Sequence, residues 1–576
     1  MPRTIFLQRI VVIGLLSLLA ACSKDASDGA FSGADSPLRY VDADTPYLFA
    51  SLKPMPDEVY DKIEPRMDKL LKSYQDIIRL SLQQGLAAAD ESAGGSQQKQ
   101  ERVAAVIQRL VGMFSAEGMS EAGFDRNSKI LFYGTGLLPV LRVSLSDVDA
   151  FEKMLQEVEA EAGGEMQKAR LGNLDYRFAG DDKLRVVLAV SEQQMVASLV
   201  PSGLSEEGLR QVFGLTLPNK PMNKAGRLDA LAEKYGFSGH GAGFIDFSRL
   251  VQTFTDEPSG INAELLQHAE FDAAQLSDVC KAEVRGMAGI APLLVTGYTA
   301  FTEREIASRT VLELRSDIAA GMMKLPTAVP GLGNDHGGLV SFGMSIDLLA
   351  AREFYAARLD AMEAEPYKCE LFAELQAGVA QGRAALNQPI PPIVYGLKGF
   401  LAIIENVEGL DLVSKQPPTA IDMRFLLATE NAPGLMAMGS MFSPELATLN
   451  LSNDGKPVRF QSPQMQGPVE EAWLAMNNNA IALAAGNGAE KKVAGMLKAD
   501  SSKPPPFFAV HMDASRYYSF VGDAMLVQQD EEMPPELGQA VRELMQNLAA
   551  LIDRVSFTVN FTDRGIEMPN VTTLKD

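Results

Sequence analysis

Residues 188–200 read LAVSEQQMVASLV, and residues 474–486 read LAMNNNAIALAAG. In both stretches an apolar run enters a short polar segment and a second apolar run leaves it, which is the pattern of a β-hairpin. Each stretch is followed by a helical pattern, EEGLRQVFGL at 206–215 and AEKKVAGML at 489–497. Antiparallel hairpins combined with helices predict an α+β fold rather than a doubly wound parallel sheet.

Three further pairs of segments match in the same order along the chain. They are 47–51 with 340–345, 246–249 with 513–516, and 301–306 with 561–566. The gaps between successive matches differ by 7 to 19 residues between the two halves. We therefore expect two tandem related repeats, each an antiparallel sheet or meander packed with a helical pair and further helices. Two unrelated α+β domains with generic hairpins are the alternative.

The boundary between the expected repeats is set by residues 325–336, LPTAVPGLGNDH. This segment is rich in Pro and Gly and has neither helical nor strand periodicity, so we interpret it as a linker. The first repeat then spans 38–324 and the second 337–576. The extra residues of the first repeat fall at 219–237 and 256–291, where we expect surface insertions.

The N-terminus has the three parts of an export signal, which we assign to residues 1–21. Arg3 and Arg9 supply its positive charge, and an apolar run follows at 10–19. That run is shorter than the roughly 20 apolar residues that a bilayer span requires. The segment ends in Leu19-Ala20-Ala21-Cys22, where small residues precede a cysteine.

This tetrapeptide resembles the lipobox of bacterial lipoproteins. The resemblance implies acylation of Cys22 and a membrane anchor, and Ser23 at the next position implies the outer membrane, facing the periplasm. Residues 22–37 are small and polar, so we expect a flexible tether. The strand motif at 43–47, ADTPY, adds a loose similarity to large envelope lipoproteins of Gram-negative bacteria, which implies no particular activity.

Two cysteines besides Cys22 remain, Cys280 and Cys369, and both fall in helical patterns. The periplasm is oxidising, which favours a disulfide between them. Two buried free thiols are the alternative.

Charge and motif content exclude several classes of protein. The chain has 576 residues and a net charge of −22, so we expect no binding to nucleic acid. It contains no phosphate-binding loop and no G-x-S-x-G nucleophile motif. Its four histidines, at 240, 268, 336 and 511, form no closely spaced pair. We therefore expect no catalytic, cofactor or metal site, while a hydrolase with an unrecognised site stays open.

The sequence Asp-x-Ser-Arg occurs twice, at 246–249 and 513–516. Aspartate and serine at the end of a strand could take part in catalysis, but both sites precede helical stretches. We expect Asp246 and Asp513 to cap those helices.

Methionines cluster at Met436, Met438 and Met441. Flexible methionines can form an adaptable apolar surface, and they can also simply fill a core. The sequence hypothesis is a non-catalytic protein that binds another envelope protein, with the methionine cluster as the candidate surface. A carrier of lipid or another apolar ligand is the alternative.

Overall fold

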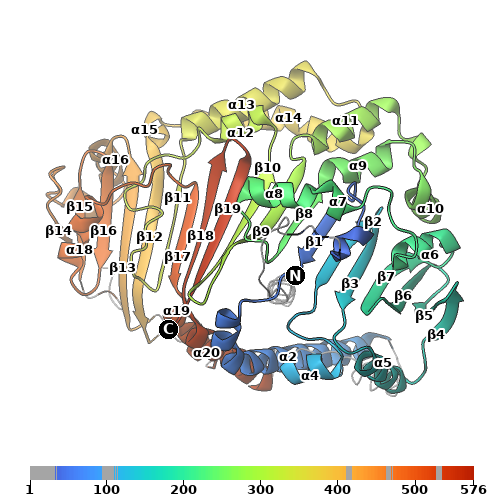
Figure 1. Cartoon of the computed structure of the whole chain (residues 1–576). Helices are drawn as coiled ribbons and strands as arrows, with labels where there is room; N and C mark the ends of the chain where they lie inside the picture. The colour runs from blue at the N-terminus through green and yellow to red at the C-terminus, as the bar shows by residue number, and fades with distance from the viewer. Residues whose placement is uncertain are drawn as a thin grey trace. The chain divides into compact units, whose positions relative to one another are not determined.

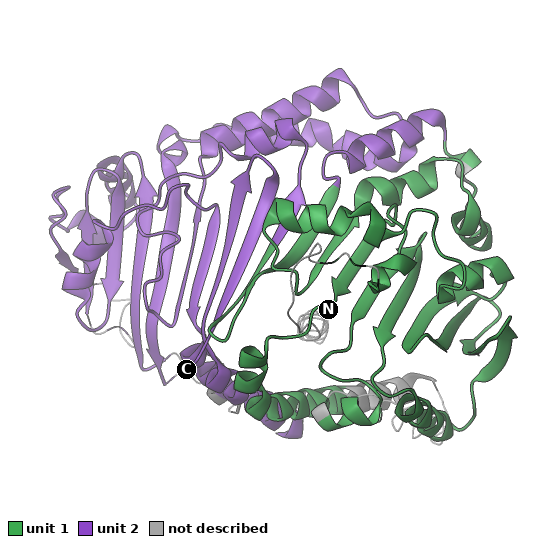
Figure 2. Ribbon diagram, in the orientation of Figure 1, with its two compact units in different colours: residues 1–276, 293–309 green, residues 277–292, 310–576 purple. Residues whose placement is uncertain are grey.

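The computed structural model describes residues 31, 33, 35–93, 109, 112, 115–409, 418–461, 469, 471–526 and 535–576 (Figure 1). The fold is α+β with one large antiparallel sheet, which confirms the predicted α+β class. The chain divides into two compact units, residues 1–276 with 293–309 and residues 277–292 with 310–576 (Figure 2). The chain passes from unit 1 into unit 2 between residues 276 and 277, returns to unit 1 at residue 293, and enters unit 2 again within β10 (Glu305–Glu313).

Unit 1 contributes nine antiparallel strands, in the spatial order β9-β8-β1-β2-β3-β7-β6-β5-β4. The strands are β1 (Tyr47–Ser51), β2 (Ile130–Thr135), β3 (Leu138–Ser144), β4 (Gln167–Leu171), β5 (Leu174–Gly180), β6 (Leu184–Ser191), β7 (Gln194–Pro201), β8 (Ala242–Asp246) and β9 (Leu293–Phe301). The hairpin predicted at 188–200 is β6–β7. Glu192 and Gln193 in its turn both have positive φ, as a tight turn between right-twisted strands requires.

The helices of unit 1 connect these strands. They are η1 (Pro37–Tyr40), α2 (Asp57–Ala93), α4 (Ala116–Glu121), α5 (Val148–Ala162), α6 (Glu206–Phe213), α7 (Met222–Ala225), α8 (Arg227–Tyr235), α9 (Phe247–Thr255), α10 (Gly260–His268) and η2 (Ala273–Gln275). Helices α7 and α8 lie where we expected a surface insertion. That expectation is wrong for this segment, because Met222, Leu228 and Tyr235 are each 1% exposed.

Unit 2 contributes the strand order β19-β18-β17-β11-β12-β13-β16-β15-β14, again all antiparallel. The strands are β11 (Val340–Ser345), β12 (Leu397–Glu408), β13 (Ala420–Thr429), β14 (Val458–Phe460), β15 (Ala472–Met476), β16 (Ala480–Ala485), β17 (Phe508–Asp513), β18 (Ile552–Thr562) and β19 (Gly565–Leu574). The predicted hairpin at 474–486 is β15–β16. The Asn477 side chain accepts the N–H groups of Asn479 and Ala480 and so fixes its turn.

The helices of unit 2 are α11 (Asp278–Ala288), α12 (Ser316–Met322), α13 (Leu348–Ala364), η3 (Glu370–Phe372), α14 (Ala373–Leu386), α15 (Pro392–Tyr395), α16 (Ala432–Ser440), α17 (Pro444–Ala447), α18 (Ala489–Met496), α19 (Ala514–Leu526) and α20 (Pro535–Leu551). Helix α11 belongs to unit 2 although unit 1 residues precede and follow it in sequence.

The segment interpreted as a linker, 325–336, lies inside unit 2. Leu325, Val329 and Leu332 in it are buried, at 7%, 1% and 1% exposure. Its Pro and Gly residues therefore form a turn that packs on the sheet. Composition predicts such a turn but does not show whether its few apolar side chains find a core.

The expected tether, residues 22–37, also differs from the structure at its C-terminal end. Phe31 is 3% exposed, and its N–H donates to the Asp229 carboxylate at 2.7 Å. Asn223 donates to the Gly33 carbonyl, and Leu38 of η1 is 1% exposed. This end is docked on unit 1, because it supplies apolar side chains to the core there. Cys22 and the export signal lie outside the described residues.

Candidate functional site

Other elements of the chain cover one face of the unit 2 sheet, and we call this the closed face. Opposed residues of antiparallel strands point to the same face, so register assigns the side chains. Val329 and Leu332 of the turn segment, together with Val493 and Met496 of α18, cover this face. Its buried strand residues are Ser341, Gly343, Ser345, Leu401, Ile403, Leu426, Ala428, Ala480, Ala482, Ala484 and Ala509. The many alanines let these covering elements lie close to the sheet.

The opposite face of the same strands stays partly exposed, and we call it the open face. Phe342 pairs with Ala402 and Val510, and Met344 pairs with Phe400 and Phe508. Its partly exposed members are Val340, Phe342, Met344, Phe400, Ala402, Ile404, Met423, Phe425, Leu427, Ile481, Leu483, Phe508, Val510, Met512, Val555, Phe557 and Val559. Phe342 is the most exposed of them, at 36%. Towards β15 the same face is buried, because Leu474, Met476 and Ala485 are 6%, 3% and 2% exposed.

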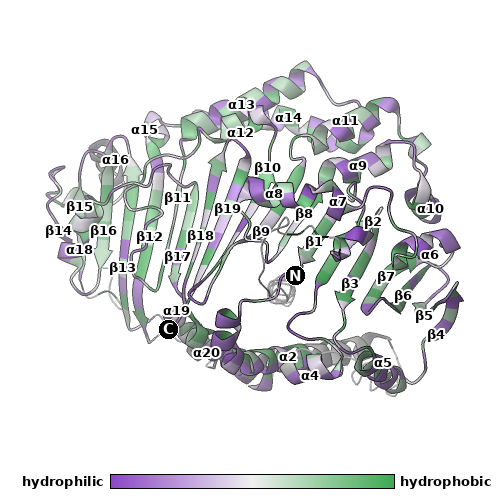
Figure 3. Cartoon of the chain, in the orientation of Figure 1, coloured by the Kyte–Doolittle hydropathy of each residue, from purple (hydrophilic) through white to green (hydrophobic). Residues whose placement is uncertain are grey.

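Aromatic rings line the middle of the open face. The Phe342 and Phe400 ring centroids lie 6.2 Å apart in an edge-to-face arrangement, and the Phe400 and Phe425 centroids lie 6.1 Å apart in a stacked one. Both geometries are favourable for aromatic pairs, so the three rings form a continuous apolar surface. Hydrophobic colour runs along much of β12 and β16 in Figure 3.

Unit 1 repeats this asymmetry on its own sheet. Leu48, Tyr133 and Phe244 lie on one face of this sheet, and each of them is at most 1% exposed. On the other face, α5 covers Leu141, Val143 and their neighbours. Beyond α5 that face carries apolar side chains that remain exposed, namely Phe132 at 39%, Val186 and Leu199 at 45%, and Leu184 at 50%.

An antiparallel sheet normally presents polar side chains on its solvent face. The open face of unit 2 has no charged residue among its members. Contiguous exposed apolar surface on a protein often marks a binding site. The open faces are therefore the candidate functional site, and the chemistry they offer is contact with apolar groups.

Comparison of the chain with known protein families, with curated proteins and with solved structures finds no match. Among the described helices, none combines the length and the apolar character needed to cross a bilayer.

The three methionines that the sequence singled out lie on and after α16. Met436 and Met438 are half-buried, whereas Met441 is 81% exposed and its neighbour Phe442 is 82% exposed. These are the two most exposed large apolar side chains in the described part of the chain. Asn431 caps the start of α16 and Ser443 caps α17, so this tip is held in place from both sides.

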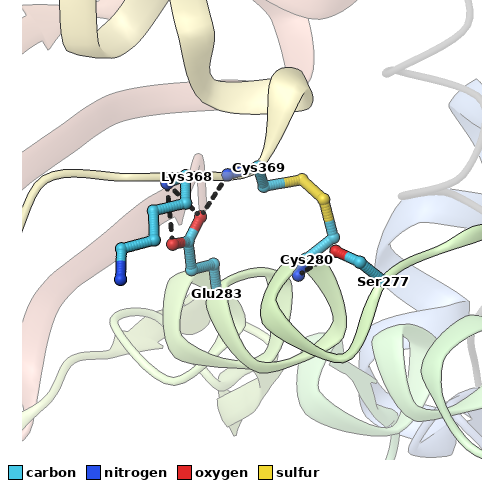
Figure 4. Close-up of a disulfide and its surroundings, with 5 residues drawn as sticks. All are labelled: Ser277, Cys280, Glu283, Lys368 and Cys369. Atoms are coloured by element: carbon cyan, nitrogen blue, oxygen red, sulfur yellow. Dashed lines mark hydrogen bonds between the residues drawn. A yellow bond between two sulfur atoms is a disulfide. The ribbon is translucent and has the colours of Figure 1, made fainter.

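Cys280 of α11 and Cys369 form a disulfide with Cα atoms 4.7 Å apart (Figure 4). The sequence predicted that Cys369 lies inside a helix, but Cys369 immediately precedes η3. The Glu283 carboxylate accepts the N–H groups of Lys368 and Cys369, which completes the contact. No residue of α11 is fully buried, so the disulfide and these polar contacts hold the helix to unit 2.

The two Asp-x-Ser-Arg sites are helix starts, as predicted. Asp246 Oδ1 accepts the Arg249 N–H at 2.9 Å, and Asp513 Oδ1 accepts the Arg516 N–H at 3.0 Å. Both carboxylates are therefore used as caps.

Within the described residues no group of three or more His, Cys, Asp or Glu side chains could hold a metal ion. The His336 ring is hydrogen-bonded to the Gly331 carbonyl, and His511 lies opposite Ser341 on the closed face. Asp335 pairs with Arg554 at 2.5 Å. These contacts do not link a serine, a histidine and an aspartate in a relay.

Sequence reasoning missed the open face, although a signal was present. In VSFGMS at 340–345 the apolar residues alternate with Ser and Gly, whereas FLAIIE at 400–405 carries apolar residues at both alternating positions. That pattern fits a strand buried on both sides as well as one with an apolar open face. Only the structure shows that, in the part of the chain that it describes, the side chains on one side stay partly exposed.

Proposed function

We propose that this chain is a lipid-anchored protein of the periplasmic face of the outer membrane, and that it binds an apolar ligand on the open faces of its sheets. It acts by binding rather than by catalysis. The observation that carries the proposal is the uncharged, aromatic-lined open face of unit 2. The lipobox-like Leu19-Ala20-Ala21-Cys22 carries the anchor.

An apolar ligand fits this face better than a peptide strand. Strands β17, β11, β12 and β13 each have a hydrogen-bonded neighbour on both sides, so their backbone groups are already paired. Recognition must then come from the side chains. Covering exposed apolar area yields about 25 cal/mol for each Å² removed from water, without any directional contact.

The two units are, in this proposal, tandem copies of one ancestral repeat. The order β9-β8-β1-β2-β3-β7-β6-β5 of unit 1 matches β18-β17-β11-β12-β13-β16-β15-β14 of unit 2 position by position. The four sequence matches fall on corresponding strands. Asp246 and Asp513 cap the helices that follow corresponding strands β8 and β17. This supports one ligand type for both open faces.

The proposal is tested by the lipids and other apolar molecules that co-purify with the native, full-length protein. The Phe342→Asp variant places a charge on the open face at an already exposed position, so folding should survive and the bound ligand should be lost. Leu349→Asp is the matched control, since Leu349 is 51% exposed on α13. Equal ligand content in wild type and Phe342→Asp would contradict the proposal.

The anchor has a separate test. The Cys22→Ser variant should lose the acyl mass that intact-protein mass spectrometry detects, and it should leave the membrane fraction. An unmodified Cys22 in the wild type would remove the anchor from the proposal and leave ligand binding unaffected.

A second candidate is binding to an envelope protein through Met441 and Phe442. Two adjacent apolar side chains, each more than four-fifths exposed, favour a partner contact. The double variant Met441→Ser, Phe442→Ser should then lose a protein cross-link while it keeps any apolar ligand. Loss of the ligand instead would link this tip to the first proposal.

A further inference from the structure

A turn covers the centre of the closed face of unit 2, and we call residues 329–337 the plug. Val329 and Leu332 in it are each 1% exposed. Hydrogen bonds hold the backbone of the plug in place. Gly331 N–H donates to the Asp500 carbonyl, and Ser502 Oγ donates to the Leu332 carbonyl at 2.8 Å. Gly331 has φ +78°, a conformation that favours glycine.

Two histidine rings support the plug from different elements. His336 belongs to the plug, and its Nε2 lies 2.8 Å from the Gly331 carbonyl oxygen. His511 belongs to β17, where it lies opposite Ser341 on the closed face, close to Gly333, Asp335 and His336 of the plug. His511 Nε2 is buried and has no hydrogen-bond partner. A neutral His511 therefore fits the site, since a proton on Nε2 would be buried without an acceptor.

The charged groups around the two rings would do little to stabilise a protonated His336 or His511. Asp335 is the carboxylate that faces both rings, and Arg554 of β18 already pairs with it at 2.5 Å. Arg424 of β13 donates to the His336 carbonyl at 3.4 Å and faces its ring. Asp513 lies two residues after His511 on β17, and its carboxylate caps α19. Glu405 of β12 binds Arg424 and Lys492. Across the strands, Ser341 and Ser556 flank His511 and carry no charge.

We propose that the plug is a proton-operated latch, closed while His336 and His511 are neutral and released from the closed face when both are protonated. Each proton adds a positive charge beside the other ring, and a proton on His336 also lies beside the positive charge of Arg424. Release would expose Val329, Leu332 and the alanine-rich core beneath them. The proposal does not depend on the ligand of the open face.

The direction of the pH effect follows from the ordinary linkage argument. Burial lowers the pKa of His336 and that of His511 below the ordinary histidine value. The unfolded or released state then takes up protons at a higher pH than the closed state does. The stability that the two neutral histidines contribute is fully present above about pH 6.5 and is lost as the pH falls below that value. For each histidine, the equilibrium constant for closing the plug falls by at most about tenfold per pH unit.

The chain provides its own probe for this test. Trp473 is the single tryptophan of the sequence, and it packs against the core that the plug covers. Denaturant unfolding of the full chain, followed by Trp473 fluorescence, should show a lower midpoint at about pH 5.5 than at about pH 7.5. The double variant His336→Gln, His511→Gln should lose this difference. The matched control His240→Gln, His268→Gln, with both substitutions in unit 1, should keep it.

Imidazole titration by NMR in the wild type makes the test independent of how the variants fold. The latch requires both rings to titrate below the ordinary value, and amide exchange in 329–337 to accelerate over the same pH range after correction for intrinsic rates. An ordinary pKa for either ring, or plug amides whose protection does not respond to pH, would overturn the proposal.

Discussion

Arg142 is the largest fully buried side chain of the described residues, at 1% exposure. It lies on β3, where its Nη1 donates to the Gln194 side chain and its Nη2 donates to the Phe213 carbonyl, each at 3.0 Å. Its guanidinium carbon is 3.8 Å from the centroid of the Tyr40 ring. Arg142 thus joins the sheet of unit 1 to η1 and α6 through hydrogen bonds and a cation–π contact.

Substitution of Arg142 should destabilise unit 1. We expect Arg142→Met to cost about 2–4 kcal/mol, because the buried Phe213 carbonyl and the part-buried Gln194 side chain lose their donor and Tyr40 loses its cation. Urea unfolding measured by circular dichroism gives this value. Arg185, whose guanidinium stacks on Phe178 at 5.0 Å, is the matched control, and Arg185→Met should change stability by less than about 0.5 kcal/mol. Equal effects of the two substitutions would contradict this role for Arg142.

The sequence predicted some residue roles and missed others for a physical reason. Asp246 and Asp513 were recognisable because a cap acts on the backbone three residues ahead, a relation that is local in sequence. Arg142 was not recognisable, because its partners Tyr40, Gln194 and Phe213 are brought to it only by the folded sheet. A charged residue in a strand pattern is ordinarily expected on the solvent side.

The helix caps provide a prediction at the scale of elements. Asp513→Ala should cost about 1 kcal/mol through loss of the cap on α19, and Asp513→Asn should cost little, since asparagine caps as well as aspartate. The Asp246 carboxylate makes a second interaction, an ion pair with Arg227 at 2.5 Å. Asp246→Asn should therefore destabilise clearly more than Asp513→Asn does. Unfolding free energies of the three variants check this, and similar values for the two asparagine variants would refute it.

Hairpins were the elements that sequence predicted best. In β6–β7 and β15–β16 a polar turn lies between two apolar runs, so the signal is complete within about 13 residues. The turn at 325–336 and the helices at 219–237 were misjudged, because their polar or Pro/Gly-rich composition conceals a few apolar side chains that find a core far away in sequence. Local composition cannot report such distant contacts.

At the scale of the whole molecule, the Cys280–Cys369 disulfide joins residues 89 apart in sequence. In the chain-entropy model a loop of this length stabilises the folded state by about 4–5 kcal/mol. Reduction should therefore lower the unfolding midpoint of unit 2, followed by Trp473 fluorescence. The Cys280→Ser, Cys369→Ser double variant should show the lower midpoint already and should not respond to a reductant. A response to reductant in that variant would mean that another effect is being measured.

The open faces are also a property of the whole molecule. Sequence could supply the strands and their order of occurrence, but exposure depends on which elements cover each face. In unit 2 the plug and α18 cover the closed face, and in unit 1 α5 covers only part of the corresponding open side. The proposed binding function follows from what these elements leave uncovered.

The most direct test of ligand binding on the open face places a photo-reactive phenylalanine analogue at position 342 in the full-length, membrane-anchored protein. Irradiation in native membranes, followed by mass spectrometry of the cross-linked peptide, identifies what lies against the face. The same analogue at Tyr355, which is 60% exposed on α13, is the control. We predict an apolar small-molecule or lipid adduct at position 342 and none at position 355. A protein adduct at position 342, or no adduct there, would contradict the account.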